Sequence, residues 1–169
     1  MDSDRGKKRM IVGAVAGVLI FAAVAVFAGM FDGLFRKTPA ESAKAAGVVE
    51  TADVVKIPLK SLESGKALYL MNVADGRQIH YFVLKSSDGR YRAALDACDV
   101  CFRANRGYRQ ESDLMVCNQC GQSFPSNRIG EVKGGCNPHP LAQGTEGQYV
   151  VIKKVDIVAG KEYFALKRS

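Results

Sequence analysis

Two cysteine pairs with the same C-x2-C spacing constrain this chain more than any other feature. They are Cys98-Asp-Val-Cys101 and Cys117-Asn-Gln-Cys120, with fifteen residues between them. Two residues between thiols let one turn aim both sulfurs at a single point, and a second such turn completes a tetrahedral set of four thiolates. The spacing lies in the C-x2-C-x15–20-C-x2-C range that is typical of metal sites. We therefore expect Cys98, Cys101, Cys117 and Cys120 to bind Zn²⁺, a single iron or an iron–sulfur cluster.

Other kinds of sulfur chemistry compete with metal binding. In an oxidising compartment each pair can close as a disulfide. Such bridges would close very short loops, and five cysteines leave one thiol unpaired. A thioredoxin-like oxidoreductase would need its CxxC motif in a βαβ unit, whereas the surrounding sequence predicts strands. Neither pair is followed by histidine, which disfavours covalent haem attachment.

The fifth cysteine, Cys136, lies in a predicted turn, Lys133-Gly-Gly-Cys-Asn-Pro138. One interpretation is a small buried residue that supports the loop, because a free cysteine packs like a small hydrophobe. The other is an additional metal ligand or a redox partner beside the four paired thiols. His139 can reach the same place, although a single loop histidine is more often a surface residue. His80 lies in the middle of a predicted strand, where a core or surface position is favoured over ligation.

The second part of the chain, from about Val49 onward, consists of short β-branched runs separated by turns. Asp75-Gly76 predicts a hairpin, and Pro58 indicates an edge strand or the end of a strand. No helix of convincing length is expected after residue 50. The sequence predicts an all-β domain over residues 49–169 whose metal ligands lie on loops. The expected strands cover residues 54–59, 67–72, 79–84, 90–95, 114–116 and 149–155.

The first part of the chain predicts a membrane anchor. Residues 11–31 form a run of 21 residues without a charge, and as a helix such a run is about 30 Å long, the thickness of a bilayer core. Basic residues in the segment 1–10 predict a cytoplasmic N-terminus, with the cysteine domain outside the cell membrane. A cleaved signal peptide ending near Ala23-Val-Ala25 is the alternative, but the length favours an anchor.

Two further expectations concern this region. Gly13 and Gly17 are spaced as in close-packed membrane helix pairs, so a homodimer through this face is an open hypothesis. Residues 32–48 predict a linker or a short frayed helix, because the stretch over residues 36–47 is small, polar and rich in alanine.

The net charge argues against nucleic acid as a partner. The whole chain carries +7. Residues 38–169 contain 18 Lys and Arg and 14 Asp and Glu, so their balance is 18 − 14 = +4. The sequence has neither a basic stripe nor interleaved aromatic residues, which a nucleic-acid interface would require.

The stretch Ala93–Leu141 resembles a known family. Its segments ALDACDVCF, GYRQESDLMVCNQCG and FPSNRIGEVKGGCNPHPL are similar to the signature of FtrD-like membrane iron–sulfur proteins. The resemblance implies an iron–sulfur centre on the four paired cysteines, with Cys136 in the GGCNP element of the family. It also implies electron transfer beside an iron permease and cupredoxin-like proteins in ferrous-iron uptake. Some family members carry a multi-span membrane region, whereas a single transmembrane helix is expected here.

The order of strand, ligand pair, strand, ligand pair and proline-rich turn also resembles Rieske domains. The predicted fold class is thus a small Rieske-like or metal-ribbon-like β domain preceded by one transmembrane helix. The expected function is electron transfer through a Cys₄ iron–sulfur centre, with no substrate chemistry of its own. The alternatives are a zinc or other soft-metal module that recruits a membrane transporter, and a thiol–disulfide oxidoreductase that uses a CxxC pair.

Overall fold

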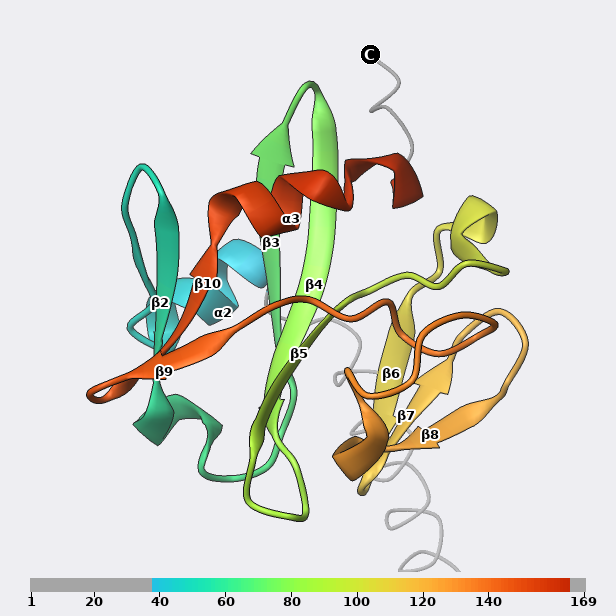
Figure 1. Cartoon of the computed structure of the whole chain (residues 1–169), viewed down its shortest axis with the longest axis horizontal. Coiled ribbons are helices and arrows are strands. Elements are labelled where there is room, and N and C mark those ends of the chain that lie inside the picture. The colour runs from blue at the N-terminus through green and yellow to red at the C-terminus, as the bar shows by residue number, and fades with distance from the viewer. Residues whose placement is uncertain (1–37, 165–169) are drawn as a thin grey trace, which may run out of the picture. The chain divides into compact units, whose positions relative to one another are not determined.

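The computed structural model describes residues 38–164. Antiparallel strands dominate this part of the chain and form three small sheets, while its helices are short (Figure 1). The prediction of a mainly β fold is therefore confirmed. Between residues 38 and 164 no helix has the length and apolar character needed to cross a membrane. The predicted span at residues 11–31 lies outside the described residues.

The three sheets differ in strand order. The first has the order β1-β2-β10-β9, the second β3-β4-β5 and the third β6-β7-β8. Their strands are β1 (Val49–Glu50), β2 (Val54–Pro58), β3 (Leu68–Ala74), β4 (Arg77–Lys85), β5 (Tyr91–Leu95), β6 (Tyr108–Glu111), β7 (Leu114–Cys117), β8 (Ser123–Pro125), β9 (Gly144–Glu146) and β10 (Tyr149–Lys153).

All six expected strands are present, and Pro58 lies at the end of β2. The strand expected over residues 149–155 is too long, because β10 ends at Lys153 and helix α3 (Lys154–Ala159) begins directly after it. In a strand Val155 and Ile157 would share one face. In the helix they point apart, so that Ile157 is buried in the core while Val155 remains 68% exposed.

The predicted hairpin at Asp75-Gly76 is confirmed. It joins β3 and β4 so that Ala74 pairs with Arg77, which leaves a two-residue turn. Asp75 and Gly76 have φ values of 50° and 71°, as a tight turn that matches the twist of the strands requires.

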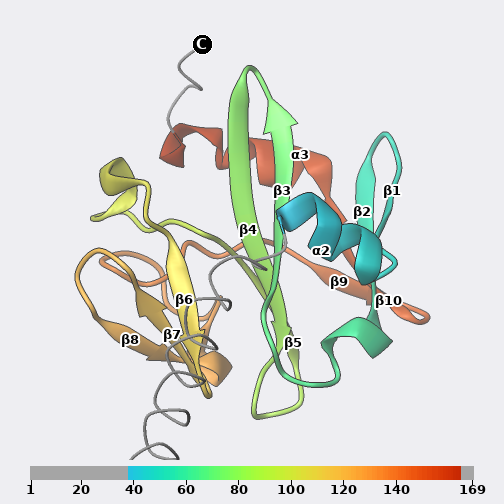
Figure 2. The same ribbon diagram turned by 180° about the vertical axis from the view of Figure 1, so that it is seen from behind.

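The sheet β3-β4-β5 separates two hydrophobic cores. Figures 1 and 2 both show it between the β1-β2-β10-β9 sheet on one side and the β6-β7-β8 sheet on the other. Alternate residues of a strand point to opposite faces. On β4, Tyr81 and Val83 therefore enter one core, and Phe82 and Leu84 enter the other.

We name these cores by their contents. The large core is built mainly from aliphatic side chains and consists of Val55, Ile57, Leu62, Leu70, Ile79, Tyr81, Val83, Ala93, Leu95, Ala97, Leu141, Val150, Ile152, Ile157 and Phe164. The cysteine-side core is smaller and consists of Phe82, Leu84, Ala94, Cys98, Tyr108, Met115, Cys117 and Ile129, with Cys101 and Cys136 packed against it.

Helix α2 (Pro39–Ala45) lies within the segment expected as a linker or frayed helix. Its first turn carries a capping box, in which Thr38 Oγ1 accepts from the Glu41 N–H and the Glu41 carboxylate accepts from the Thr38 N–H. The helix contacts β3, and Ala43 packs against the large core. Short 3₁₀ helices complete the fold: η1 (Leu59–Leu62), η2 (Phe102–Ala104), η3 (Ser126–Arg128) and η4 (Lys161–Tyr163).

Candidate metal centre

The first cysteine pair lies in the loop that follows β5. The loop turns back immediately, because the Phe102 N–H donates to the Cys98 carbonyl at 3.2 Å. The Cys101 N–H donates to Cys98 Sγ at 3.1 Å. Cys98 is buried and Cys101 is half-buried. The two-residue spacing thus brings both thiols to one side of a single turn, as the sequence predicts.

The second pair lies at the end of β7. Cys117 is the last residue of that strand, and its N–H donates to the Gln122 carbonyl at 2.8 Å. The Gly121 N–H donates to the Cys117 carbonyl at 2.9 Å. Gly121 adopts φ = 76°, a conformation that only glycine takes easily. Cys117 is buried, whereas Cys120 is exposed at the outer end of the turn.

Cys136 reaches the same place through long-range pairing. Its loop is followed by residues 139–141, which lie beside β5: the Leu95 N–H donates to the His139 carbonyl at 2.8 Å, and the Leu141 N–H donates to the Ala93 carbonyl at 3.2 Å. The Tyr108 hydroxyl donates to the Cys136 carbonyl at 2.5 Å. These contacts hold the Cys136 loop against the strand that leads to Cys98.

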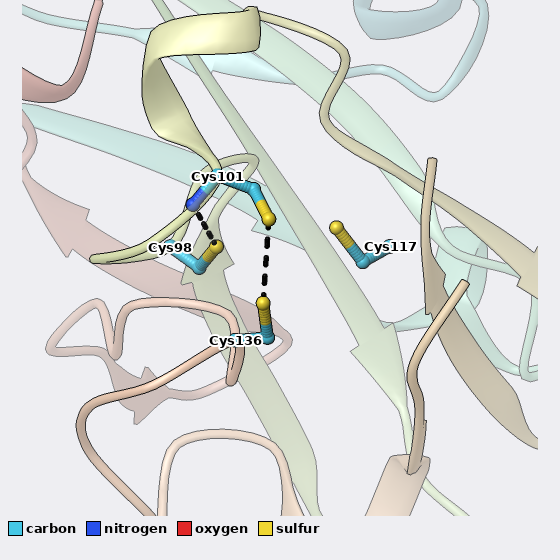
Figure 3. A group of neighbouring side chains, drawn as sticks. All are labelled: Cys98, Cys101, Cys117 and Cys136. Atoms are coloured by element: carbon cyan, nitrogen blue, oxygen red, sulfur yellow. Dashed lines mark hydrogen bonds between the residues drawn. The ribbon is translucent and has the colours of Figure 1, made fainter. Parts of the chain in front are cut away.

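Four thiols converge on one point. The sulfur atoms of Cys98, Cys101, Cys117 and Cys136 all lie within 4.8 Å of one another, and Figure 3 shows them directed toward a common centre. The four side chains come from three loops that are far apart in the sequence. Among the described residues they form the group of side chains suited to hold a metal ion.

Cys120 lies next to this group on the solvent side. Its sulfur is 3.3 Å from Cys136 Sγ, and Cys136 Sγ is in turn 3.4 Å from Cys101 Sγ. The four cysteines expected from the paired motifs and the four that converge in the structure therefore share Cys98, Cys101 and Cys117. They differ in whether Cys120 or Cys136 is the fourth.

The thiols do not ionise alike. Burial raises the pKa of Cys98, but hydrogen bonds from the backbone of Cys101 and from Tyr108 outweigh this and lower it. A hydrogen bond from the Gln122 backbone, helped by Cys136, lowers the pKa of Cys120 to about 7. Burial raises the pKa of Cys136. The Cys136 thiol lowers the pKa of Cys101, but burial and the neighbouring thiolates outweigh it and raise that pKa to about 11.

This donor set fits a soft metal. Several thiolates at van der Waals distance repel one another, which keeps part of the cluster protonated, and a bound cation removes the repulsion as it displaces the protons. Thiolate sulfur is the ligand that zinc, single iron ions and iron–sulfur clusters prefer. The five cysteines are free thiols in the structure, so no disulfide removes a donor from the cluster.

The loops around the thiols are tied together by polar residues that the sequence did not single out. Asp96 Oδ1 accepts from the Tyr108 N–H at 2.7 Å, which joins the first cysteine loop to β6. Burial raises the pKa of Asp96 to about 6, although this hydrogen bond acts in the opposite direction. Tyr108 makes two hydrogen bonds near the thiols: its N–H donates to Asp96, and its hydroxyl donates to the Cys136 carbonyl. Its only signal in the sequence is its place in the segment between the cysteine pairs.

A second set of contacts surrounds Asp99, which lies between Cys98 and Cys101 in the sequence. The Tyr163 hydroxyl donates to Asp99 Oδ1 at 2.6 Å and lies 2.9 Å from His139 Nδ1. The Tyr163 ring packs against His139 at a tilt of 39°, with the ring centroids 4.6 Å apart, and meets Phe102 edge-on at 5.6 Å. His139 thus contacts Tyr163 rather than the thiol group. His80, the other histidine, is half-buried in β4 beside Phe164.

Comparisons with known proteins give one match. No curated protein and no solved structure matches the chain. Residues 62–164 match the family described as membrane iron-sulfur containing protein, FtrD-like. The matched region covers more than half of the chain and includes all five cysteines. The chain therefore belongs to the FtrD-like family of membrane iron–sulfur proteins.

Proposed function

We propose that this protein is a membrane-anchored, one-electron carrier whose redox centre is an iron bound by the clustered thiols. The observation that carries the proposal is the convergence of Cys98, Cys101, Cys117 and Cys136 within 4.8 Å in a family named for iron–sulfur proteins. When bound, a thiolate-ligated iron centre supplies reversible one-electron oxidation and reduction.

The chain's own residues bind the centre and tune it. Cys98 and Cys117 are 1% and 2% exposed, so two of the sulfurs are shielded from water by the cysteine-side core. Backbone N–H groups directed at thiolate sulfur, such as that of Cys101, stabilise negative charge on the centre and raise its reduction potential. The exposed side, near Cys120, leaves a short path from the centre to a docked redox protein.

The proposal extends to location and partners. Residues 11–31 would span the membrane once and hold the cysteine domain outside the cytoplasm. The carrier would exchange single electrons with membrane redox proteins and would serve as an accessory of ferrous-iron transport, as the family resemblance implies. The proposed anchor lies outside the residues that the structure describes.

The test is a redox titration of the full chain, purified anaerobically in mild detergent. We expect bound iron, a coloured thiolate–iron absorption band, and reversible bleaching with a one-electron slope of about 59 mV per tenfold change in ratio. A colourless protein with stoichiometric zinc and no redox wave would exclude electron transfer.

A zinc-binding structural module is the second candidate function. It is favoured by the position of Cys98 and Cys117 inside the cysteine-side core, where a redox-inert ion would complete the packing of the sheet β6-β7-β8. In small sites of this kind the free energy of metal binding is folding free energy. Such a module would recruit a membrane transporter without passing electrons, and the same metal analysis separates the two functions.

A further inference from the structure

We propose that the thiol cluster holds one tetrahedral metal ion rather than a multi-iron cluster. The ligands are Cys98, Cys101, Cys117 and Cys136, and Cys120 is a fifth thiol that exchanges with Cys136. The inference rests on the proposed metal centre, but it holds for iron and for zinc alike.

The distances between sulfur atoms support a single ion. In a tetrahedral site with metal–sulfur bonds of about 2.3 Å, the ligand sulfurs lie about 3.8 Å apart. All four sulfurs here lie within 4.8 Å of one another, and those of Cys101 and Cys136 are 3.4 Å apart. In an iron–sulfur cluster held by four cysteines at most two thiolates share an iron, and thiolates on different irons are separated by the sulfide-bridged core, so four sulfurs could not all lie this close together.

The same distances limit what the turns can hold as they stand. Four sulfurs within 4.8 Å of one another leave room for one ion between them, whereas several irons and their sulfides would require these loops to move apart.

Burial divides the five thiols into inner and outer positions. Cys98 and Cys117 are buried, Cys101 and Cys136 are half-buried, and Cys120 is exposed. Cys136 lies between Cys101 and Cys120, at 3.4 Å and 3.3 Å from their sulfurs. Cys136 thus belongs to the converging group and also contacts Cys120. Among the sulfur pairs described here, it is the member of the group whose sulfur lies 3.3 Å from that of Cys120.

This arrangement suits ligand exchange at the surface. In such an exchange Cys120 would replace Cys136 as the fourth ligand: the bond from Cys136 to the ion would break as the bond from Cys120 formed, the Cys120 proton would pass to the Cys136 sulfur, and no electron would be transferred. The ion would keep four thiolates throughout, while its outermost ligand becomes accessible to solvent. Cys120 therefore offers a route for an ion to reach or leave the inner set.

Metal analysis tests the single ion. The full chain, purified anaerobically, is assayed for iron, zinc and acid-labile sulfide. We expect one metal ion per chain and no labile sulfide. Two or more irons with matching sulfide would overturn the inference while leaving electron transfer intact. One zinc ion without a redox wave would exclude electron transfer while supporting the inference.

A matched pair of variants tests the ligand roles. In the full chain loaded with Co²⁺, Cys120→Ser should keep the thiolate-to-cobalt absorption of the unchanged chain but release cobalt to a chelator more slowly. Cys136→Ser should still bind through Cys120, with affinity reduced at least about tenfold. The double variant should lose about a quarter of the absorption, because three of four thiolates remain.

The opposite pattern would overturn the assignment. If Cys120→Ser lowers the absorption and Cys136→Ser does not, the ligand set is that of the paired motifs and Cys136 is the outer thiol. Unchanged release rates in Cys120→Ser would exclude exchange. Circular dichroism of each cobalt-loaded variant separates loss of a ligand from loss of the fold.

Discussion

The two cores of this protein share one wall but are completed in different ways. The large core is built from aliphatic and aromatic side chains contributed by two sheets and helix α3, and it closes by packing alone. The cysteine-side core has fewer apolar residues, and four of the five cysteines are part of it or pack against it. Protonated thiols pack like small apolar side chains, but the thiolates that bind a metal are costly to bury unless the ion neutralises them. With the proposed metal bound, we therefore expect the large core to be held by packing alone and the cysteine-side core to depend also on the ion.

Removal of the metal should produce the largest difference between the two cores. Treatment with a chelator, or the change Cys117→Ser, should release the β6-β7-β8 sheet, because structural zinc sites contribute up to about 10–16 kcal/mol in small peptides. Hydrogen exchange should then accelerate in β6 and β7. Protection in β2 and β10 should persist. Simultaneous loss of protection in both sheets would show that the two cores unfold as one unit.

Truncation on opposite faces of β4 sharpens the comparison. Ile79→Ala affects the large core and Leu84→Ala the cysteine-side core, and each should cost about 2–5 kcal/mol in the metal-loaded protein. After metal removal, the cost of Leu84→Ala should shrink, because its surroundings are already loosened. The cost of Ile79→Ala should not change. Denaturant unfolding with and without chelator measures both values, and equal costs in all four experiments would contradict the division.

A smaller effect is expected from the hydroxyl that supports the Cys136 loop. Tyr108→Phe removes the hydrogen bond to the Cys136 carbonyl while it keeps the buried ring. We expect a loss of about 0.5–1.5 kcal/mol in stability and faster release of metal to a chelator. Tyr163→Phe is the control, because it removes a hydroxyl that contacts Asp99 and His139 instead. Identical release rates for the two variants would argue against a specific role of Tyr108.

The smallest effect that we expect is the pH dependence of stability caused by His80 in β4, in the sheet that both cores share. Burial lowers the pKa of His80 in β4. The unfolded chain therefore binds the proton more readily, so stability should fall as the pH drops below about 6.5, the usual pKa of histidine, toward the lower pKa of the folded state. His80→Gln should reduce this slope, as measured by thermal unfolding between pH 5 and 8. A slope unchanged by the variant would assign it to other groups.

Much of the local structure follows from short patterns. Asp75-Gly76 predicts its hairpin because only a few residues adopt positive φ, and Gly121 completes the second cysteine turn for the same reason. The nearly continuous apolar run at residues 79–84 predicts the strand β4, whose two faces enter different cores. The predicted last strand is two residues too long, because residues 154–155 begin helix α3. A strand and a short helix could both bury the nearby Ile157, and only the packing in the large core distinguishes them.

The short strands β6 and β8 were not expected, since each consists largely of polar residues and forms only through pairing with β7.

The arrangement of the five thiols likewise follows only in part from the sequence. The sequence by itself determined that two pairs of thiols sit on tight turns, because the spacing within each pair is a local property. Only the tertiary structure decided that Cys136 joins the inner group and that Cys120 faces solvent. Those positions depend on the pairing of residues 139–141 with β5, a contact between distant segments whose free energy arises only once the cores have formed.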